Sequence, residues 1–238
     1  MKYAVYVEGK AELLFVADVL SKYSDYNPNA VGFRCINLNS DDYEYVPYPM
    51  QGDESANRYY QIVNVNNDKR VVSKLKQDIP NLAQQGYEVI IGLRDVFGAD
   101  YDSICGRQVI DKTLIEKMHQ AQSQQMAFDG ADTRLHFAIM EYETWMMALM
   151  DKFIVSNGGN PEKLFADAGV DYHSDFENTI YHPYNKVQAI YKAIQLTYKK
   201  HEEDQFSFLS SLRKEDYETL RCSRRCASFK SFLDSLLP

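Results

Sequence analysis

Apolar residues recur along the first part of the chain in short continuous runs, separated by longer stretches in which they are spaced for one face of a helix. The runs at 4–7, 31–37, 88–95 and 135–140 are typical of strands buried on both faces of a parallel sheet. Helical spacing begins near Ala11, continues from an Asn67-Asp68 cap to a stop at Gly86, and returns over 109–121. The pattern therefore predicts a βαβαβ alternation.

Two further regions complete the predicted organisation. Residues 41–57 are polar and rich in tyrosine, with Pro47, Pro49 and Gly52, which indicates a loop, and 58–65 are expected to be extended. No strand is expected after Trp145, where helical spacing covers 183–199, 205–212 and 228–236. The prediction is an α/β fold with a mainly parallel sheet flanked by helices over 1–150, and a helical C-terminal part over 151–238.

Composition narrows the class of protein. The chain has 238 residues, of which 45% are hydrophobic, so it can bury a core. No apolar run approaches the roughly 20 residues of a membrane helix, and the start resembles no secretory signal, so we expect a cytoplasmic protein. The four scattered cysteines are expected to be free thiols. The net charge of -8 argues against a general nucleic-acid coat protein but does not exclude a nuclease.

Acidic residues follow three of the predicted strands. Glu8 ends the first apolar run, Asp95 ends the strand at 88–95, and Glu141 and Glu143 come directly after 135–140. The carboxyl ends of parallel strands are where ligands bind in open α/β sheets, so these acids are expected to converge. Carboxylates brought together repel one another unless a cation neutralises them or one takes up a proton. A divalent metal ion is the simplest explanation.

The type of ligand indicates which metal and which chemistry. Oxygen ligands without a matching His or Cys set favour Mg²⁺ or Mn²⁺. Because magnesium keeps several waters and is completed by substrate phosphates, the pattern predicts phosphodiester or phosphoryl chemistry. Glu8 is expected to be a ligand or general base and Asp95 a ligand. The helix N-terminus after Gly9 is expected to accept a phosphate oxygen.

The start of the chain, Val7-Glu8-Gly9-Lys10-Ala11-Glu12, resembles the first motif of TOPRIM-type metal-dependent nucleases, particularly the overcoming-lysogenisation-defect branch. With the strand ending at Asp95 and the Glu143-Thr144-Trp145 segment, the chain is similar to the TOPRIM-like family called domain of unknown function 4276. The tail, with His182-Pro183 followed by Lys186 and a basic segment over 221–230, is also similar to that family. The resemblance implies a Rossmann-like TOPRIM-type sheet.

One position departs from the TOPRIM pattern. Those enzymes carry Asp-x-Asp after the middle strand, and here Phe97 stands at the second place. Asp100 or Asp102 is the alternative ligand. In other interpretations the site holds one metal weakly or has decayed. The complete set of expected metal ligands is Glu8, Glu12, Asp95, Asp100, Glu141 and Glu143.

Each candidate also has a structural interpretation. Glu12 is equally a favourable acid in a first helical turn, and Asp95 a loop cap. Trp145 is expected in the core and His182 as a helix cap. Lys186 is expected either to neutralise a phosphate as part of the catalytic set or to be a solvated lysine. The residues expected to contact nucleic acid, unless they form a solvated face, are Lys10, Arg221, Arg224, Arg225 and Lys230.

The sequence thus predicts a metal-dependent nuclease or related phosphodiester hydrolase acting on DNA or RNA. The resemblance implies an effector of an anti-phage or toxin-like system, controlled by an ATP-binding-cassette-type ATPase. The alternative is a catalytically inactive interaction module of the same fold that binds a partner protein, and a weaker alternative is a small-molecule phosphohydrolase.

Overall fold

The computed structural model describes residues 1–39, 42–48, 52–66 and 70–237, and it divides into two compact units. Unit 1 comprises residues 1–94 and 113–137, and unit 2 comprises residues 95–112 and 138–237. The chain therefore changes unit after residues 94, 112 and 137. The sequence analysis placed a single boundary at residue 150.

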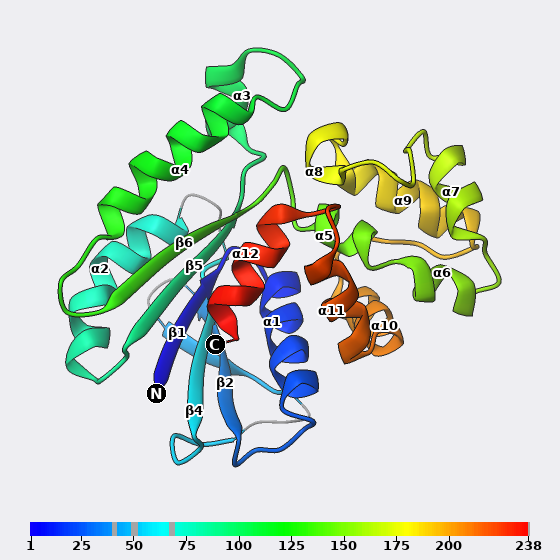
Figure 1. Cartoon of the computed structure of the whole chain (residues 1–238). Helices are drawn as coiled ribbons and strands as arrows, with labels where there is room; N and C mark the ends of the chain where they lie inside the picture. The colour runs from blue at the N-terminus through cyan, green and yellow to red at the C-terminus, as the bar shows by residue number, and fades with distance from the viewer. Residues whose placement is uncertain (40–41, 49–51, 67–69, 238) are drawn as a thin grey trace. The chain divides into compact units, whose positions relative to one another are not determined.

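Unit 1 is built around a six-stranded sheet with the order β3-β2-β4-β1-β5-β6 (Figure 1). The strands are β1 (Lys2–Val7), β2 (Val31–Asn39), β3 (Asp42–Val46), β4 (Arg58–Asn64), β5 (Val89–Asp95) and β6 (Asp132–Ala138). The last residues of β5 and β6, Asp95 and Ala138, lead into unit 2. The confirmed fold class is therefore α/β with a mixed, mostly parallel sheet.

Parallel pairing accounts for the continuous apolar runs. Val5 in the central strand β1 is paired with Ile62 of β4 on one side and with Ile91 of β5 on the other. All three side chains are fully buried, as expected for strands covered on both faces. Strands β5 and β6 are also parallel, because hydrogen bonds join their like ends, Asp132 to Glu88 and Val96 to Ala138.

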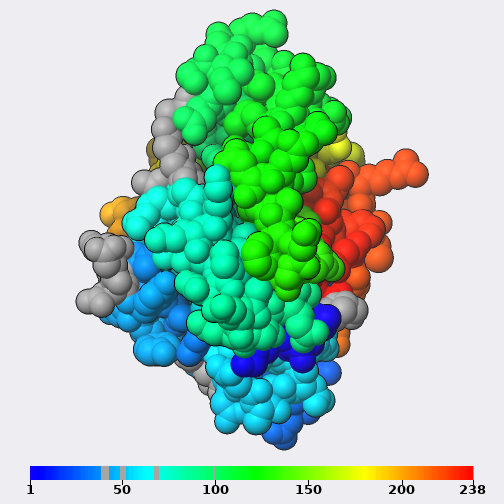
Figure 2. All heavy atoms as spheres, turned by 90° about the vertical axis from the view of Figure 1, so that its left-hand side faces the viewer, coloured from blue at the N-terminus to red at the C-terminus, as the bar shows by residue number. Residues whose placement is uncertain are grey.

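Helices of unit 1 cover both faces of the sheet. Helix α1 (Lys10–Tyr23) lies on one face, and α2 (Arg70–Gln84) and α4 (Lys112–Met126) lie on the other (Figure 1). Figure 2 looks onto the face that α2 and α4 cover. Gly92 in β5 lets α2 approach closely, since a Cβ there would lie 2.8 Å from Leu75 Cδ1. A larger residue would require the Leu75 side chain to shift.

The predicted loop at 41–57 is wrong for Asp42–Val46, which forms the edge strand β3. This strand runs antiparallel to β2, with Tyr45 opposite Ile36. Tyrosine and valine fit a pleated edge surface well, and this preference outweighed the nearby prolines and glycine. The proposed helix cap at Asn67-Asp68 and residues 41 and 49–51 of the predicted loop lie outside the described residues.

Unit 2 is helical, and its described residues after β6 contain no further strand, as predicted. Trp145 is fully buried in this unit, where its ring stacks on Phe232 and its Nε1 donates to Ser228 Oγ at 2.9 Å. The core role predicted for Trp145 is therefore confirmed. The helices are α3 (Ala99–Cys105), α5 (Glu143–Ala148), α6 (Asp151–Ser156), α7 (Pro161–Asp167), α8 (Phe176–Thr179), α9 (Pro183–Ala193), α10 (Glu202–Ser211), α11 (Lys214–Cys222) and α12 (Ala227–Leu236).

Candidate functional site

The turn from β1 into α1 places two expected metal ligands in unit 1. Glu8 follows the last residue of β1 and is partly exposed, and Glu12 lies in the first turn of α1 with 7% of its surface exposed. Gly9 has φ −140°, an extended conformation open to any residue. A Cβ at Gly9 would lie 2.8 Å from Glu12 Oε2. The glycine therefore makes room for the Glu12 carboxylate where the chain turns from β1 into α1.

The other four expected ligands belong to unit 2. Asp95 is the last residue of β5, Asp100 lies in the first turn of α3, and Glu141 and Glu143 flank the start of α5. The six residues are thus not gathered within one unit. Across the described part of the chain, no group of three or more His, Cys, Asp or Glu side chains is arranged to hold a metal ion.

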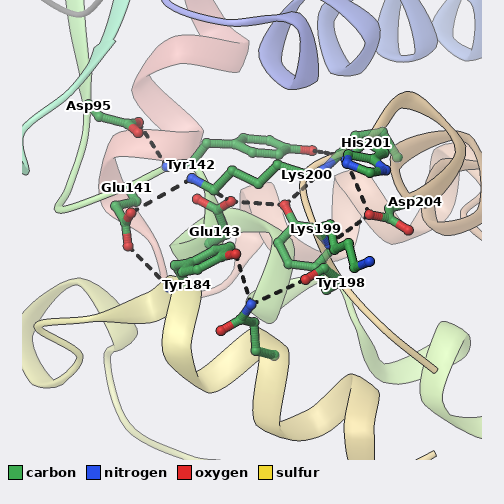
Figure 3. Close-up of polar contacts among 12 residues, drawn as sticks. Asp95, Glu141, Tyr142, Glu143, Tyr184, Tyr198, Lys199, Lys200, His201 and Asp204 are labelled. Atoms are coloured by element: carbon green, nitrogen blue, oxygen red, sulfur yellow. Dashed lines mark hydrogen bonds and ion pairs between the residues drawn. The ribbon is translucent and has the colours of Figure 1, made fainter. Parts of the chain in front are cut away.

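Within unit 2, Glu141 and Glu143 meet around one lysine. Lys200 Nζ lies 2.8 Å from Glu143 Oε1 and 3.7 Å from Glu141 Oε1. Figure 3 shows the ammonium group between the two carboxylates. We call Glu141, Glu143 and Lys200 the acidic centre. A side chain of the same chain thus places a cation between these acids, and the divalent metal ion predicted from the sequence stays a prediction.

Neutral polar groups hold the acidic centre in place. Tyr198 donates its hydroxyl to Glu143 Oε1 at 2.8 Å and accepts a hydrogen bond from Gln205 Nε2 at 2.9 Å. The backbone N–H of Tyr184, in the first turn of α9, donates to Glu141 Oε2 at 3.1 Å. A carboxylate thus already occupies the N-terminus of α9, where the helix dipole favours negative charge.

Burial makes these charges costly. The Glu143 side chain is 1% exposed, and its Oε2 atom is buried without a hydrogen-bond partner. Burial and the nearby Glu143 raise the pKa of Glu141, although Lys200 opposes the shift. Burial by itself lowers the pKa of Lys200, but attraction by Glu143 and Glu141 outweighs it and raises that pKa. The centre therefore combines a firmly protonated lysine with a carboxylate oxygen that has unused bonding capacity.

Two strained backbone positions flank the acidic centre. Met140, directly before Glu141, has φ +64°, and Lys200 itself has φ +60°. Residues other than glycine rarely adopt this left-handed conformation. Each such position costs of order 1 kcal/mol or more and persists only where the surrounding structure enforces it. Such strain is concentrated at functional sites.

Asp95 supports the same turn from the end of β5. Its Oδ1 accepts the backbone N–H of Tyr142 at 2.8 Å, so it holds the segment between Glu141 and Glu143. Phe97, which stands where TOPRIM enzymes carry the second acid, packs edge-to-face against Tyr181 and His182. His182 is the N-cap of α9, as predicted, although its side chain forms no capping hydrogen bond.

The predicted catalytic residue Lys186 lies on α9. Its Nζ donates to the carbonyl of Ala168 at 2.8 Å, and Ala168 caps the C-terminus of α7. Lys186 also lines a cavity of about 330 Å³ together with His182 and Tyr181. The Tyr181 hydroxyl donates to Asp102 Oδ1 at 2.7 Å. Asp102, an alternative ligand in the sequence analysis, is therefore engaged by a tyrosine.

Acids and aromatic rings of the same unit already contact much of the basic segment in unit 2. Arg221 Nε lies 2.7 Å from Asp234, and Lys230 pairs with the same carboxylate. The Arg225 guanidinium stacks 4.3 Å from the centre of the Tyr172 ring. Arg224 is exposed in unit 2, and Lys10, the remaining predicted nucleic-acid contact, lies at the start of α1 in unit 1. The positive charge available to nucleic acid is thus smaller than the sequence suggested.

Sequence reasoning missed Lys200, Tyr198 and Gln205. Lys200 and Tyr198 contact Glu143, and Gln205 donates to Tyr198, yet all three stand 55 or more positions later in the chain, and no motif links them to Glu143. Gln205 is fully buried, which is unusual for a polar side chain. The only signal for Gln205 in the sequence was its place at the start of the helical spacing over 205–212, which became part of α10.

Comparisons with known protein families, with characterised proteins and with solved structures find no match. Among the helices described, none is both long enough and apolar enough to cross a membrane.

Proposed function

We propose that this protein is a metal-dependent hydrolase of phosphodiester bonds, with its chemistry at the acidic centre. The observation that carries the proposal is the buried Oε2 of Glu143, which has no hydrogen-bond partner in a centre flanked by strained backbone. A buried carboxylate oxygen without a partner costs free energy and calls for an explanation. A bound cation supplies one.

The residues fit Mg²⁺ or Mn²⁺ as a partly hydrated ion. Magnesium is bound through one or two carboxylates and completed by waters and substrate phosphates, and Glu141 and Glu143 offer that number. When bound, the ion would polarise the phosphate and lower the pKa of water. Lys200 would have to leave its position between the carboxylates. Its side chain is 41% exposed, so it has room to move.

The chain's own residues have distinct roles in this proposal. Glu141 and Glu143 bind the ion, and Tyr198 positions Glu143 through its hydroxyl. Lys200, once displaced from the two carboxylates, would be available to neutralise a phosphate of the substrate. Asp95 is a positioning residue that holds the turn through the N–H of Tyr142.

The resemblance to TOPRIM-like proteins supplies the wider part of the proposal. It supports DNA or RNA as the substrate, an ATP-binding-cassette-type ATPase as a partner, and a role as an anti-phage or toxin-like effector. Glu8, Glu12, Asp100 and Lys186 stay predicted site residues.

A specific observation favours a second function. Phe97 fills the place of the second acid with an aromatic ring packed on Tyr181 and His182, and Lys200 already balances Glu143. Both features suit a catalytically inactive module that binds a partner protein through the same fold. In that case the acidic centre is a purely structural ion-pair network.

Calorimetric titration of Mn²⁺ into the full chain separates the two. The proposal expects binding by the wild type, at least tenfold weaker binding by Glu143→Gln, and little change in Glu177→Gln. Glu177 is a matched control because it is another buried glutamate of unit 2, engaged by Ser228. Absence of binding to the wild type, or equal affinity in Glu143→Gln, would overturn the proposal.

The same titration tests the predicted ligands Glu8 and Asp95 through Glu8→Gln and Asp95→Asn. Where the wild type binds Mn²⁺, incubation with single- and double-stranded DNA and RNA follows. Cleavage that depends on Mn²⁺ and disappears in Glu143→Gln is the expected result.

A further inference from the structure

Unit 1 contains a cavity of about 300 Å³ that no part of the proposed function uses. It lies where residues of β1 to β4 and of α2 meet, and three of its ten lining residues are tyrosines. We call it the tyrosine pocket. The residues that matter for its chemistry are Tyr6, Arg34, Tyr43, Tyr45, Gln61 and Asp78. Its volume is at the lower end of the range for small-molecule sites.

Arg34 gives the pocket a positive charge that no acid balances among the described residues. Its Nε donates to Gln61 Oε1 at 3.1 Å, and its second Nη nitrogen bonds the same oxygen. The Tyr87 hydroxyl also interacts with the guanidinium and with Gln61 Oε1. These partners are neutral, and among the described residues no carboxylate pairs with Arg34. A half-buried arginine in such a setting is suited to bind an anion.

The acid in the pocket does not serve this purpose, because other groups already engage it. Asp78 Oδ1 accepts from Lys74 Nζ at 2.8 Å, and its Oδ2 accepts from the Tyr6 hydroxyl at 2.8 Å. The ion pair with Lys74 cancels the charge of Asp78. The net charge facing the cavity is therefore that of Arg34.

Two tyrosines at the rim offer flat apolar surfaces. Tyr43 and Tyr45 stand two positions apart on the edge strand β3, so they project from the same face of the sheet. Their exposed fractions are 50% and 64%. Exposed aromatic rings beside an unbalanced arginine form the combination that binds nucleotides, because bases stack on the rings while the guanidinium holds a phosphate.

We propose that the tyrosine pocket binds a nucleotide unit, with its phosphate on Arg34 and its base against Tyr43 and Tyr45. The cavity has room for one such unit. The ligand is either a free mononucleotide or the terminal nucleotide of a single strand. The inference does not rest on the proposed hydrolase activity, because all these residues belong to unit 1 and the acidic centre belongs to unit 2.

Calorimetric titration of the full chain with AMP, adenosine, inorganic phosphate and a ten-nucleotide deoxyadenosine strand tests the proposal. We expect AMP or the strand to bind more tightly than adenosine or phosphate. Tighter binding of AMP identifies a free nucleotide, and tighter binding of the strand identifies a nucleic-acid end. No binding of either, or phosphate binding as tightly as AMP, would overturn the proposal.

Variants then assign the contacts. Arg34→Met keeps the apolar stem, removes the charge and should weaken binding at least tenfold. Tyr45→Ala changes an exposed residue, so it should fold normally and weaken binding about fivefold, at the low end for lost base stacking. The matched controls are Arg134→Met and Tyr26→Ala. Arg134 is a partly exposed arginine paired with Asp132, and Tyr26 is an exposed tyrosine elsewhere in unit 1. Unchanged affinity in both pocket variants would contradict the assignment.

Discussion

Lys200 in unit 2 and Arg34 in unit 1 are both partly buried cations, but their surroundings are opposite. Lys200 lies 2.8 Å from the carboxylate of Glu143 and 3.7 Å from that of Glu141. Arg34 has only the neutral groups of Gln61 and Tyr87 as partners among the described residues. The charge of Lys200 is balanced by acids of the same unit, whereas the charge of Arg34 is available to a ligand.

This difference shows that residue type alone does not tell whether a charge is available. The basic segment around Arg221 looks like a nucleic-acid contact in the sequence, yet Asp234 pairs with both Arg221 and Lys230, and Glu218 also pairs with Arg221. Arg34 belongs to no basic cluster and carries a net positive charge into a cavity. The partners of a charged side chain decide whether its charge is available to a ligand, because a charge paired within the protein contributes little to the attraction of a distant anion.

The largest effect we expect is a change of stability with pH. It arises from one titratable group in each unit, His136 and Glu141, whose pKa values burial shifts. Burial lowers the pKa of His136 in unit 1 to about 4, whereas burial raises that of Glu141 in unit 2. The unfolded chain protonates His136 near its ordinary pKa of 6.5. Between pH 6.5 and 4 the unfolded state therefore binds more protons, and stability falls by about 3 kcal/mol as the pH falls.

For Glu141 the sign is opposite, since the folded state then binds more protons and stability falls as the pH rises above the ordinary value of 4.5. Urea denaturation across pH 4 to 7 measures both. His136→Gln should flatten the acid side of the profile, and Glu141→Gln should not. An unchanged acid side in His136→Gln would contradict the prediction.

The next largest effect is expected when Lys200 is replaced. Lys200→Met leaves Glu143 as a buried charge without its cation, and such losses cost roughly 3–5 kcal/mol when both partners are buried. Because Lys200 is 41% exposed, we expect a destabilisation of about 2 kcal/mol. Lys230→Met is the control, with an exposed ion pair and a cost below about 0.5 kcal/mol. Chemical denaturation would contradict the prediction if the two variants were equally stable.

The smallest loss of stability is expected when Arg34 is replaced. Arg34→Met removes hydrogen bonds to a neutral partner, and Gln61 Oε1 keeps its bond from Tyr87. We therefore expect a loss of less than about 1 kcal/mol in the free energy of unfolding. Denaturation of Arg34→Met and Lys200→Met side by side should give the larger loss for Lys200→Met. The reverse order would show that Arg34 is a structural residue.

Most of the sheet could be predicted from the sequence. The apolar runs that became β1, β2, β5 and β6 are continuous because both faces are buried, and this pattern depends on local sequence alone. Strand β3 was missed because prolines and a glycine surround it, and its pairing with β2 only arises in three dimensions. The short helices α3, α6, α7, α8 and α11 were missed because their apolar spacing is too brief to detect.

The candidate site was predicted in part. The two acids after β6, Glu141 and Glu143, do meet at one place, and the sequence indicated that a cation or a proton would be needed where acids converge. Lys200, Tyr198 and Gln205 could not be predicted, because they approach Glu143 only through the packing of helices far along the chain. Glu8 and Glu12 belong to unit 1, whereas the other four predicted ligands belong to unit 2.

The sequence by itself determined the α/β class, the mostly parallel strands and the acids at their ends, because apolar periodicity and strand-end chemistry are local properties. Only the tertiary structure decided which charges are balanced: a lysine from a loop distant in the sequence for Glu143, an aspartate for Arg221, and, among the described residues, no acid for Arg34. Electrostatic energy depends on distance in space, and the fold alone brings residues that are remote in sequence within that distance.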